Sequence, residues 1–90
     1  MMDIEKLIKH YASIKEQSIK GRTVTPEQVS CLLKRLNTGV EILGKSVMGH
    51  DIYSFSVGRG SEKVLLWTQM HGNEPTATGA VFDIFNFLNN

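Results

Sequence analysis

The sequence predicts an α/β fold, namely the N-terminal part of a mixed β-sheet flanked by helices. Apolar residues recur at helical spacing through the first 36 residues. From residue 40 to residue 58 the pattern changes to the alternation that is typical of strands. A continuous apolar run and then a proline-initiated apolar helix follow. The expected order is therefore two helices, a β-hairpin, a buried strand and a helix.

Residues 1–39 are expected to form a helical leader of two amphipathic helices. The first spans residues 3–19, and its apolar stripe consists of Ile4, Leu7, Ile8, Tyr11 and Ile14. The second has a clear start, because Thr25 can cap a helix, a proline follows it, and Gln28 completes a capping box. We expect residues 37–39, which read Asn-Thr-Gly, to end this helix.

Residues 40–90 are expected to form the sheet and its covering helix, so that residues 1–90 make up a single section of one domain. Residues 41–47 and 52–58 are predicted to pair as a hairpin. The run Val-Leu-Leu-Trp at 64–67 is apolar on both faces, which is typical of a strand inside a covered sheet. The helix that begins at Pro75 has an apolar stripe of Ala77, Ala80, Val81, Ile84, Phe85 and Leu88, widened by Phe82 and Phe87.

The composition of the chain excludes several classes of protein. Ten basic and nine acidic residues give a net charge of +1, and no basic run predicts nucleic acid or an anionic membrane as a partner. A single cysteine rules out an internal disulfide. No signal peptide is visible after Met1, so a natural start there predicts a cytoplasmic protein, whereas a trimmed start leaves the location open.

A histidine and a glutamate follow the predicted buried strand. His71 and Glu74 stand three residues apart, and imidazole and carboxylate are both good zinc ligands. Gly72 between them is expected to let the chain turn sharply, and Pro75 to start the helix directly after them. The simpler interpretation is a polar loop in which Glu74 only favours the helix dipole. The position at the end of a strand favours a metal site.

Two motifs resemble the zinc carboxypeptidase family. Residues 67–76, which read WTQMHGNEPT, look like that family's first metal motif, in which a strand runs into His-Gly-x-Glu. Residues 43–53, which read LGKSVMGHDIY, resemble the family's Gly-x-Ser-x-x-Gly-Arg-x-Ile hairpin. One departure is His50, which stands where the family often has arginine.

The resemblance implies the N-terminal portion of a metallocarboxypeptidase that releases C-terminal amino acids from peptides. His71 and Glu74 would bind Zn²⁺, which would polarise the scissile carbonyl. The third zinc ligand, the general-base glutamate and the substrate-binding arginines would lie in the rest of the catalytic domain beyond residue 90. No catalytic residue is therefore expected within this chain, which should be inactive alone. Gln69 and Asn73 border the site and are candidates for orienting the ligands.

Two other functions fit the same motif. Zinc-dependent deacylases of N-acyl amino acids also carry a strand that ends in His-Gly-x-Glu. The third possibility is a non-catalytic relative that has lost its metal and serves as a binding or structural module. The upstream hairpin matches the peptidase pattern at its proper distance from His71, and this favours the peptidase.

Overall fold

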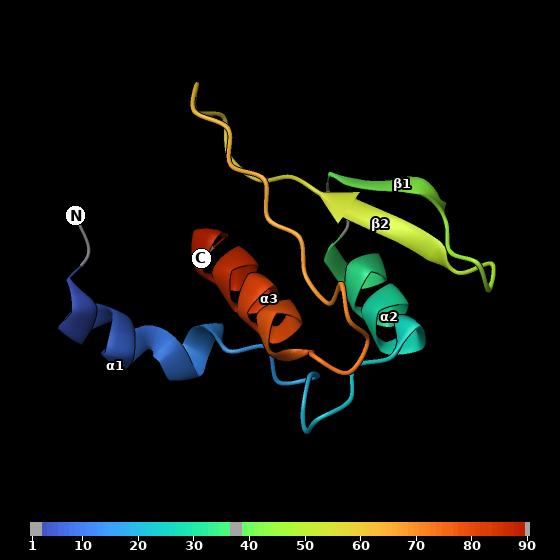
Figure 1. Ribbon diagram of the computed structural model, residues 1–90. Helices are drawn as coiled ribbons and strands as arrows, with labels where there is room; N and C mark the ends of the chain where they lie inside the picture. Colours follow the sequence, from blue (N-terminus) through green and yellow to red (C-terminus); the bar gives the residue numbers. More distant parts are fainter. Residues whose placement is uncertain (1–2, 37–38, 90) are drawn as a thin grey trace.

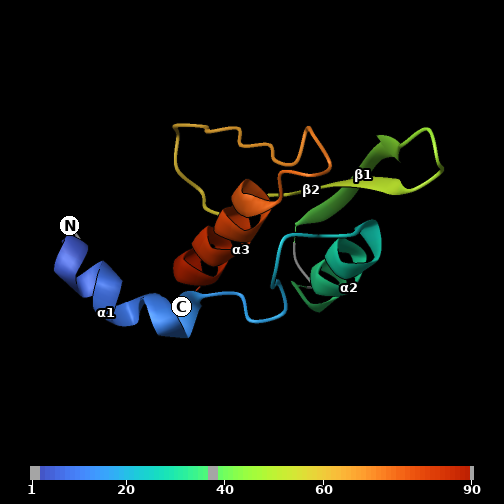
Figure 2. The same ribbon diagram turned by 60° about the horizontal axis from the view of Figure 1, so that its bottom comes forward.

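A computed structural model describes residues 3–36 and 39–89 and shows a small α/β arrangement of three helices and a two-stranded antiparallel sheet (Figure 1). The elements follow the chain as α1 (Ile4–Ile14), α2 (Pro26–Leu36), β1 (Val40–Lys45), β2 (Asp51–Phe55) and α3 (Thr76–Leu88). In both ribbon views α3 lies between α1 on one side and α2 with the hairpin on the other (Figure 2).

The core forms where α2, the hairpin and α3 meet. Leu32 and Leu33 of α2 and Phe82 of α3 form one buried cluster. The hairpin contributes Phe55, whose ring stacks on Phe82 at 5.6 Å and meets Phe85 edge-on at 5.2 Å. Aromatic pairs in these two arrangements add to the stabilisation that apolar burial already provides. The alternation predicted for β2 is thereby confirmed on its inner face.

Helix α2 begins as its sequence predicts. The Thr25 hydroxyl accepts a hydrogen bond from the amide of Gln28 at 3.2 Å, and the Gln28 side chain accepts one from the amide of Thr25 at 2.8 Å. This reciprocal capping box satisfies two amides that have no partner inside the helix. The helix runs to Leu36. Two of the three residues predicted to end it, 37 and 38, lie outside the described residues.

The predicted hairpin is confirmed, with strands slightly displaced from the expected ranges. Val40 pairs with Phe55 and Lys45 with Asp51, and a bulge interrupts the register between Ile42 and Gly44. Before the hairpin, Gly39 adopts φ +64, and a Cβ atom there would lie 2.8 Å from the Ser56 carbonyl oxygen. That backbone contact excludes a larger residue at the point where the two strand ends come together.

Helix α1 is shorter than predicted, because α3 terminates it. The helix ends at Ile14, where the sequence pattern predicts continuation to residue 19. Asp83 of α3 accepts the amide of Glu16 at 2.7 Å, and Asn86 donates to the Ile14 carbonyl at 2.9 Å. Side chains of α3 thus replace the bonds that another helical turn would have made. The predicted apolar stripe is also not packed, since Ile14 is its only buried member.

Glu16 connects the ends of three helices. Its carboxylate accepts hydrogen bonds from Ser18 and from Asn86 of α3, and it lies 3.4 Å from the guanidinium of Arg35 on α2. Partial burial by itself would raise the pKa of Glu16, but the hydrogen bonds from Ser18 and Asn86 and the charge of Arg35 together lower the pKa below its ordinary value. The ionised carboxylate is therefore the form that holds this junction together.

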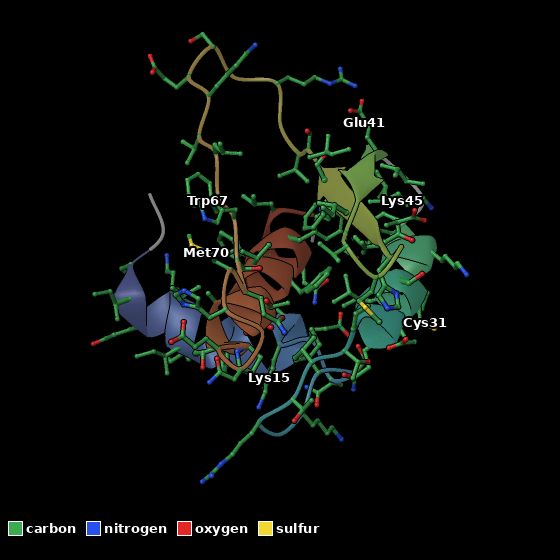
Figure 3. All side chains as sticks on the ribbon, turned by 45° about the vertical axis from the view of Figure 1, so that its right-hand side comes forward. Lys15, Cys31, Glu41, Lys45, Trp67 and Met70 are labelled. Carbon is green, nitrogen blue, oxygen red and sulfur yellow. The ribbon has the colours of Figure 1, made fainter. Side chains whose placement is uncertain are left out.

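The prediction of a buried strand at residues 64–67 is wrong. Residues 56–75 form no helix or strand, and the sheet of the described residues is antiparallel rather than mixed. The four apolar side chains are exposed at Val64 (82%), Leu65 (79%), Leu66 (58%) and Trp67 (69%). In Figure 3, Trp67 lies on the extended segment outside the packed side chains. An apolar run becomes a strand only beside a free strand edge, and no such edge is paired with it here.

Helix α3 forms as predicted, with Pro75 at its N-cap, but its buried face overlaps only part of the predicted apolar stripe. Thr78, Phe82 and Phe85 are its buried residues. Ile84 and Leu88, which belong to the predicted stripe, are largely exposed. No helix in the described part of the chain has the length and apolar character needed to span a membrane.

Candidate metal site

The side chains of His71 and Glu74 meet in the loop that leads into α3. The Nδ1 atom of His71 lies 3.1 Å from Oε2 of Glu74, and the side chains are 68% and 69% exposed. In a tetrahedral zinc site with bonds of about 2.0–2.2 Å, neighbouring ligand atoms lie roughly 3.3–3.5 Å apart. A small opening of this pair would therefore accommodate a cation between the two atoms. Without one, the contact is a hydrogen bond across a tight turn.

The chain turns at residues 72 and 73, between His71 and Glu74, as the sequence predicts. The amide of Glu74 donates to the carbonyl of His71 at 3.0 Å, which closes the turn. Gly72 makes this turn without a positive φ, whereas Gln69, two residues before His71, has φ +56. No strand leads directly into His71, so the backbone bend at Gln69 stands where the end of a strand was predicted.

The hydrogen bonds of the Gln69 side chain go to groups other than the side chains of His71 and Glu74. The Gln69 side chain donates to the carbonyls of Val24 and Gly72 and accepts from the hydroxyl of Thr78. Asn73 is exposed. The sequence analysis did not single out Thr78, whose side chain is buried at 5% exposure. A threonine near the start of an otherwise apolar helix is a signal for such a residue, because a buried hydroxyl needs a polar partner.

The site has two candidate metal ligands, and a catalytic zinc ion usually takes three from the protein. Among residues 3–36 and 39–89, no group of three His, Cys, Asp or Glu side chains is close enough to hold one metal ion. His50 lies in the turn of the hairpin, where its amide donates to the Ser46 hydroxyl at 3.1 Å. The donor types at His71 and Glu74 fit zinc, but they supply only part of a coordination shell.

A cavity of about 550 Å³ borders the same loop. Its walls come from the start of α2, the inner side of the hairpin, α3, and the loop residues Thr68, Gln69 and Gly72. His71 and Glu74 do not line it. Gln69 and Gly72 of the same loop therefore border the cavity, whereas the two ligand candidates do not.

No protein-family model matches this chain, and neither the curated proteins nor the solved structures include a significant match. The assignment of a function therefore depends on the two motifs and on the geometry of this loop.

Proposed function

We propose that this chain is the N-terminal portion of a zinc-dependent metallocarboxypeptidase, in which His71 and Glu74 are two of the zinc ligands. The observation that carries the proposal is the approach of Nδ1 of His71 and Oε2 of Glu74 to 3.1 Å on an exposed loop. A zinc ion supplies Lewis acidity toward the carbonyl of a peptide substrate. The residues of this chain would hold that ion and fix where it sits relative to the start of α3.

The remaining machinery is proposed to come from the rest of the catalytic domain, beyond residue 90. That part would supply a third zinc ligand, a general base and the groups that bind the C-terminal carboxylate of the substrate. The four adjacent exposed apolar residues at 64–67 support this division, because an exposed apolar patch is typical of a surface that another part of a protein covers. In the complete domain that part would cover these residues.

The decisive experiment uses the full-length protein with zinc and measures release of the C-terminal residue from a short peptide. Glu74→Ala should lower kcat/KM by at least about 100-fold, since loss even of an outer partner of a metal ligand costs roughly 10–100-fold. The matched control is Glu62→Ala, which removes an exposed carboxylate from the same segment and should leave the activity unchanged.

Other outcomes of this experiment would move the assignment elsewhere. Hydrolysis of N-acyl amino acids alone, lost in Glu74→Ala, would assign the protein to the deacylases. No activity on either substrate, together with no bound zinc, would leave a non-catalytic binding module.

Residues 1–90 alone are expected to bind zinc weakly and to release no amino acid from peptides. Two protein ligands leave most of the coordination shell to water, and general acid–base help of about 10²–10⁴-fold is missing. Calorimetry with zinc, comparing wild type with His71→Ala, tests the first expectation. Tight one-to-one binding that depends on His71 would show that the site is more complete than proposed.

A further inference from the structure

Gln69 has an unusual backbone conformation at a point where the chain must change direction. With φ +56 it is the one non-glycine residue with positive φ among those that the structure describes. Side chains with a Cβ atom disfavour this left-handed region, so the surrounding contacts have to hold Gln69 in it. The bend lies two residues before His71, directly ahead of the loop that carries both ligand candidates.

The side chain of Gln69 joins the chain ahead of α2 to the loop and to the start of α3. Its Nε2 atom donates to the carbonyl of Val24 at 2.9 Å, ahead of α2, and to the carbonyl of Gly72 at 3.0 Å, within the loop. Its Oε1 atom accepts from the hydroxyl of Thr78 at 2.8 Å, in the first turns of α3. Both amide protons and the carbonyl oxygen are thereby used.

The direction of these hydrogen bonds is fixed. The Thr78 hydroxyl has one proton, which goes to Gln69, so in the 2.9 Å contact between Thr78 and Thr68 the Thr68 hydroxyl must be the donor. If the side-chain amide of Gln69 were rotated by half a turn, its oxygen would face the carbonyl oxygens of Val24 and Gly72, and neither contact could be a hydrogen bond. The half-buried side chain therefore has a single orientation in which every partner is satisfied.

We infer that Gln69 is a positioning residue, which holds the loop so that His71 and Glu74 face one cation. The inference rests on the proposed function. Gly72 lies between the two ligand candidates in the chain, and its carbonyl is held by Gln69. With that carbonyl fixed, the bond from the Glu74 amide to the His71 carbonyl keeps the two side chains on the same side of the turn. The pair is thus arranged before a metal arrives, which is the usual role of groups that support metal ligands.

The test substitution is Gln69→Asn. Asparagine tolerates the left-handed region and keeps the amide, but it is one methylene too short to reach Val24 and Gly72 from the same backbone position. The matched control is Gln17→Asn, which shortens an exposed glutamine outside this loop. Three quantities are measured in the 90-residue chain: the urea unfolding midpoint, amide hydrogen exchange, and the zinc concentration that half-saturates the His71 ring signals in NMR spectra.

For Gln69→Asn we expect exchange of the Glu74 amide about 10-fold faster and zinc binding at His71 about 10-fold weaker. The unfolding midpoint should fall, because hydrogen bonds are lost, but exchange in the middle of α3 should rise by no more than that fall explains. Gln17→Asn should change none of these. Wild-type values for both Glu74 exchange and zinc binding in Gln69→Asn would overturn the inference, as would a loss of protection through α3 larger than the fall in the midpoint explains.

The proposed function and this inference can fail separately. If zinc leaves the His71 signals of the wild type unchanged, the metal assignment fails for this chain. Exchange of the Glu74 amide, measured without metal, then still decides whether Gln69 holds the loop. If the wild type binds zinc and Gln69→Asn binds it equally well, the metal assignment stands and the positioning role does not.

Discussion

Truncation of Phe82 tests whether α3 is held by the face that the structure assigns to it. Phe82 is 3% exposed and stacks on Phe55 of the hairpin. Phe→Ala in such a position costs about 3–5 kcal/mol, the sum of lost burial and the cavity left behind. A chain of 90 residues at about 0.05–0.15 kcal/mol per residue has a total stability of roughly 5–13 kcal/mol. Six buried apolar side chains among the described residues place this chain at the low end. Phe82→Ala should therefore remove most of the stability.

The assay is urea unfolding followed by far-ultraviolet circular dichroism. With a denaturant dependence of about 1–3 kcal/mol per molar urea, the midpoint should fall by at least about 1 M. The control is Leu88→Ala in the same helix, where the side chain is 57% exposed and the loss should stay below about 1 kcal/mol. A larger loss for Leu88→Ala than for Phe82→Ala would refute the packing, because it would mean that the face of α3 described as exposed is the buried one.

Three further predictions concern other parts of the chain. Thr25→Ala removes one half of the capping box and should destabilise the chain by about 1 kcal/mol in urea unfolding, with no change if the cap is absent. The pKa of Glu16 is below its ordinary value in the folded chain, so its contribution to stability is present above the ordinary pKa and is lost as pH falls through the lowered one. Urea midpoints measured from neutral to acid pH should thus fall less steeply in Glu16→Gln than in wild type, and identical slopes would contradict the assignment. Trp67, the one tryptophan, should show the red-shifted emission of an indole in water and be readily quenched by iodide in the 90-residue chain, whereas blue-shifted, protected emission would mean that residues 64–67 are covered.

Local sequence signals predicted local structure well. The start of α2 follows from residues that bind one another within a single turn, and Thr25 and Gln28 make the two bonds that this spacing predicts. The hairpin also follows from a local alternation of side chains, since Tyr53 and Phe55 have to share one face of β2. In both cases the residues that decide the structure lie within a few positions of each other.

Features set by distant partners were not predictable in the same way. Helix α1 ends at Ile14 because Asp83, far along the chain, accepts the Glu16 amide, and no pattern near residue 14 contains that information. At the candidate site, the spacing of His71 and Glu74 correctly placed them side by side. The sequence also made Gln69 a candidate for orienting the ligands, but it could not show that Gln69 bonds to Val24 and Thr78, which lie outside the loop.

The long connection between β2 and α3 has a consequence for how the chain holds together when it is cut. Residues 56–75 contain no helix or strand, and Arg59 and Lys63 within them are exposed, so a trypsin-like protease should nick the chain there first. The two pieces would remain joined through contacts that do not depend on that peptide bond, including the stacking of Phe55 on Phe82 and the bond from Glu16 to Asp83. Separately produced halves, one ending and one beginning within this connection, should for the same reason reassemble by complementation.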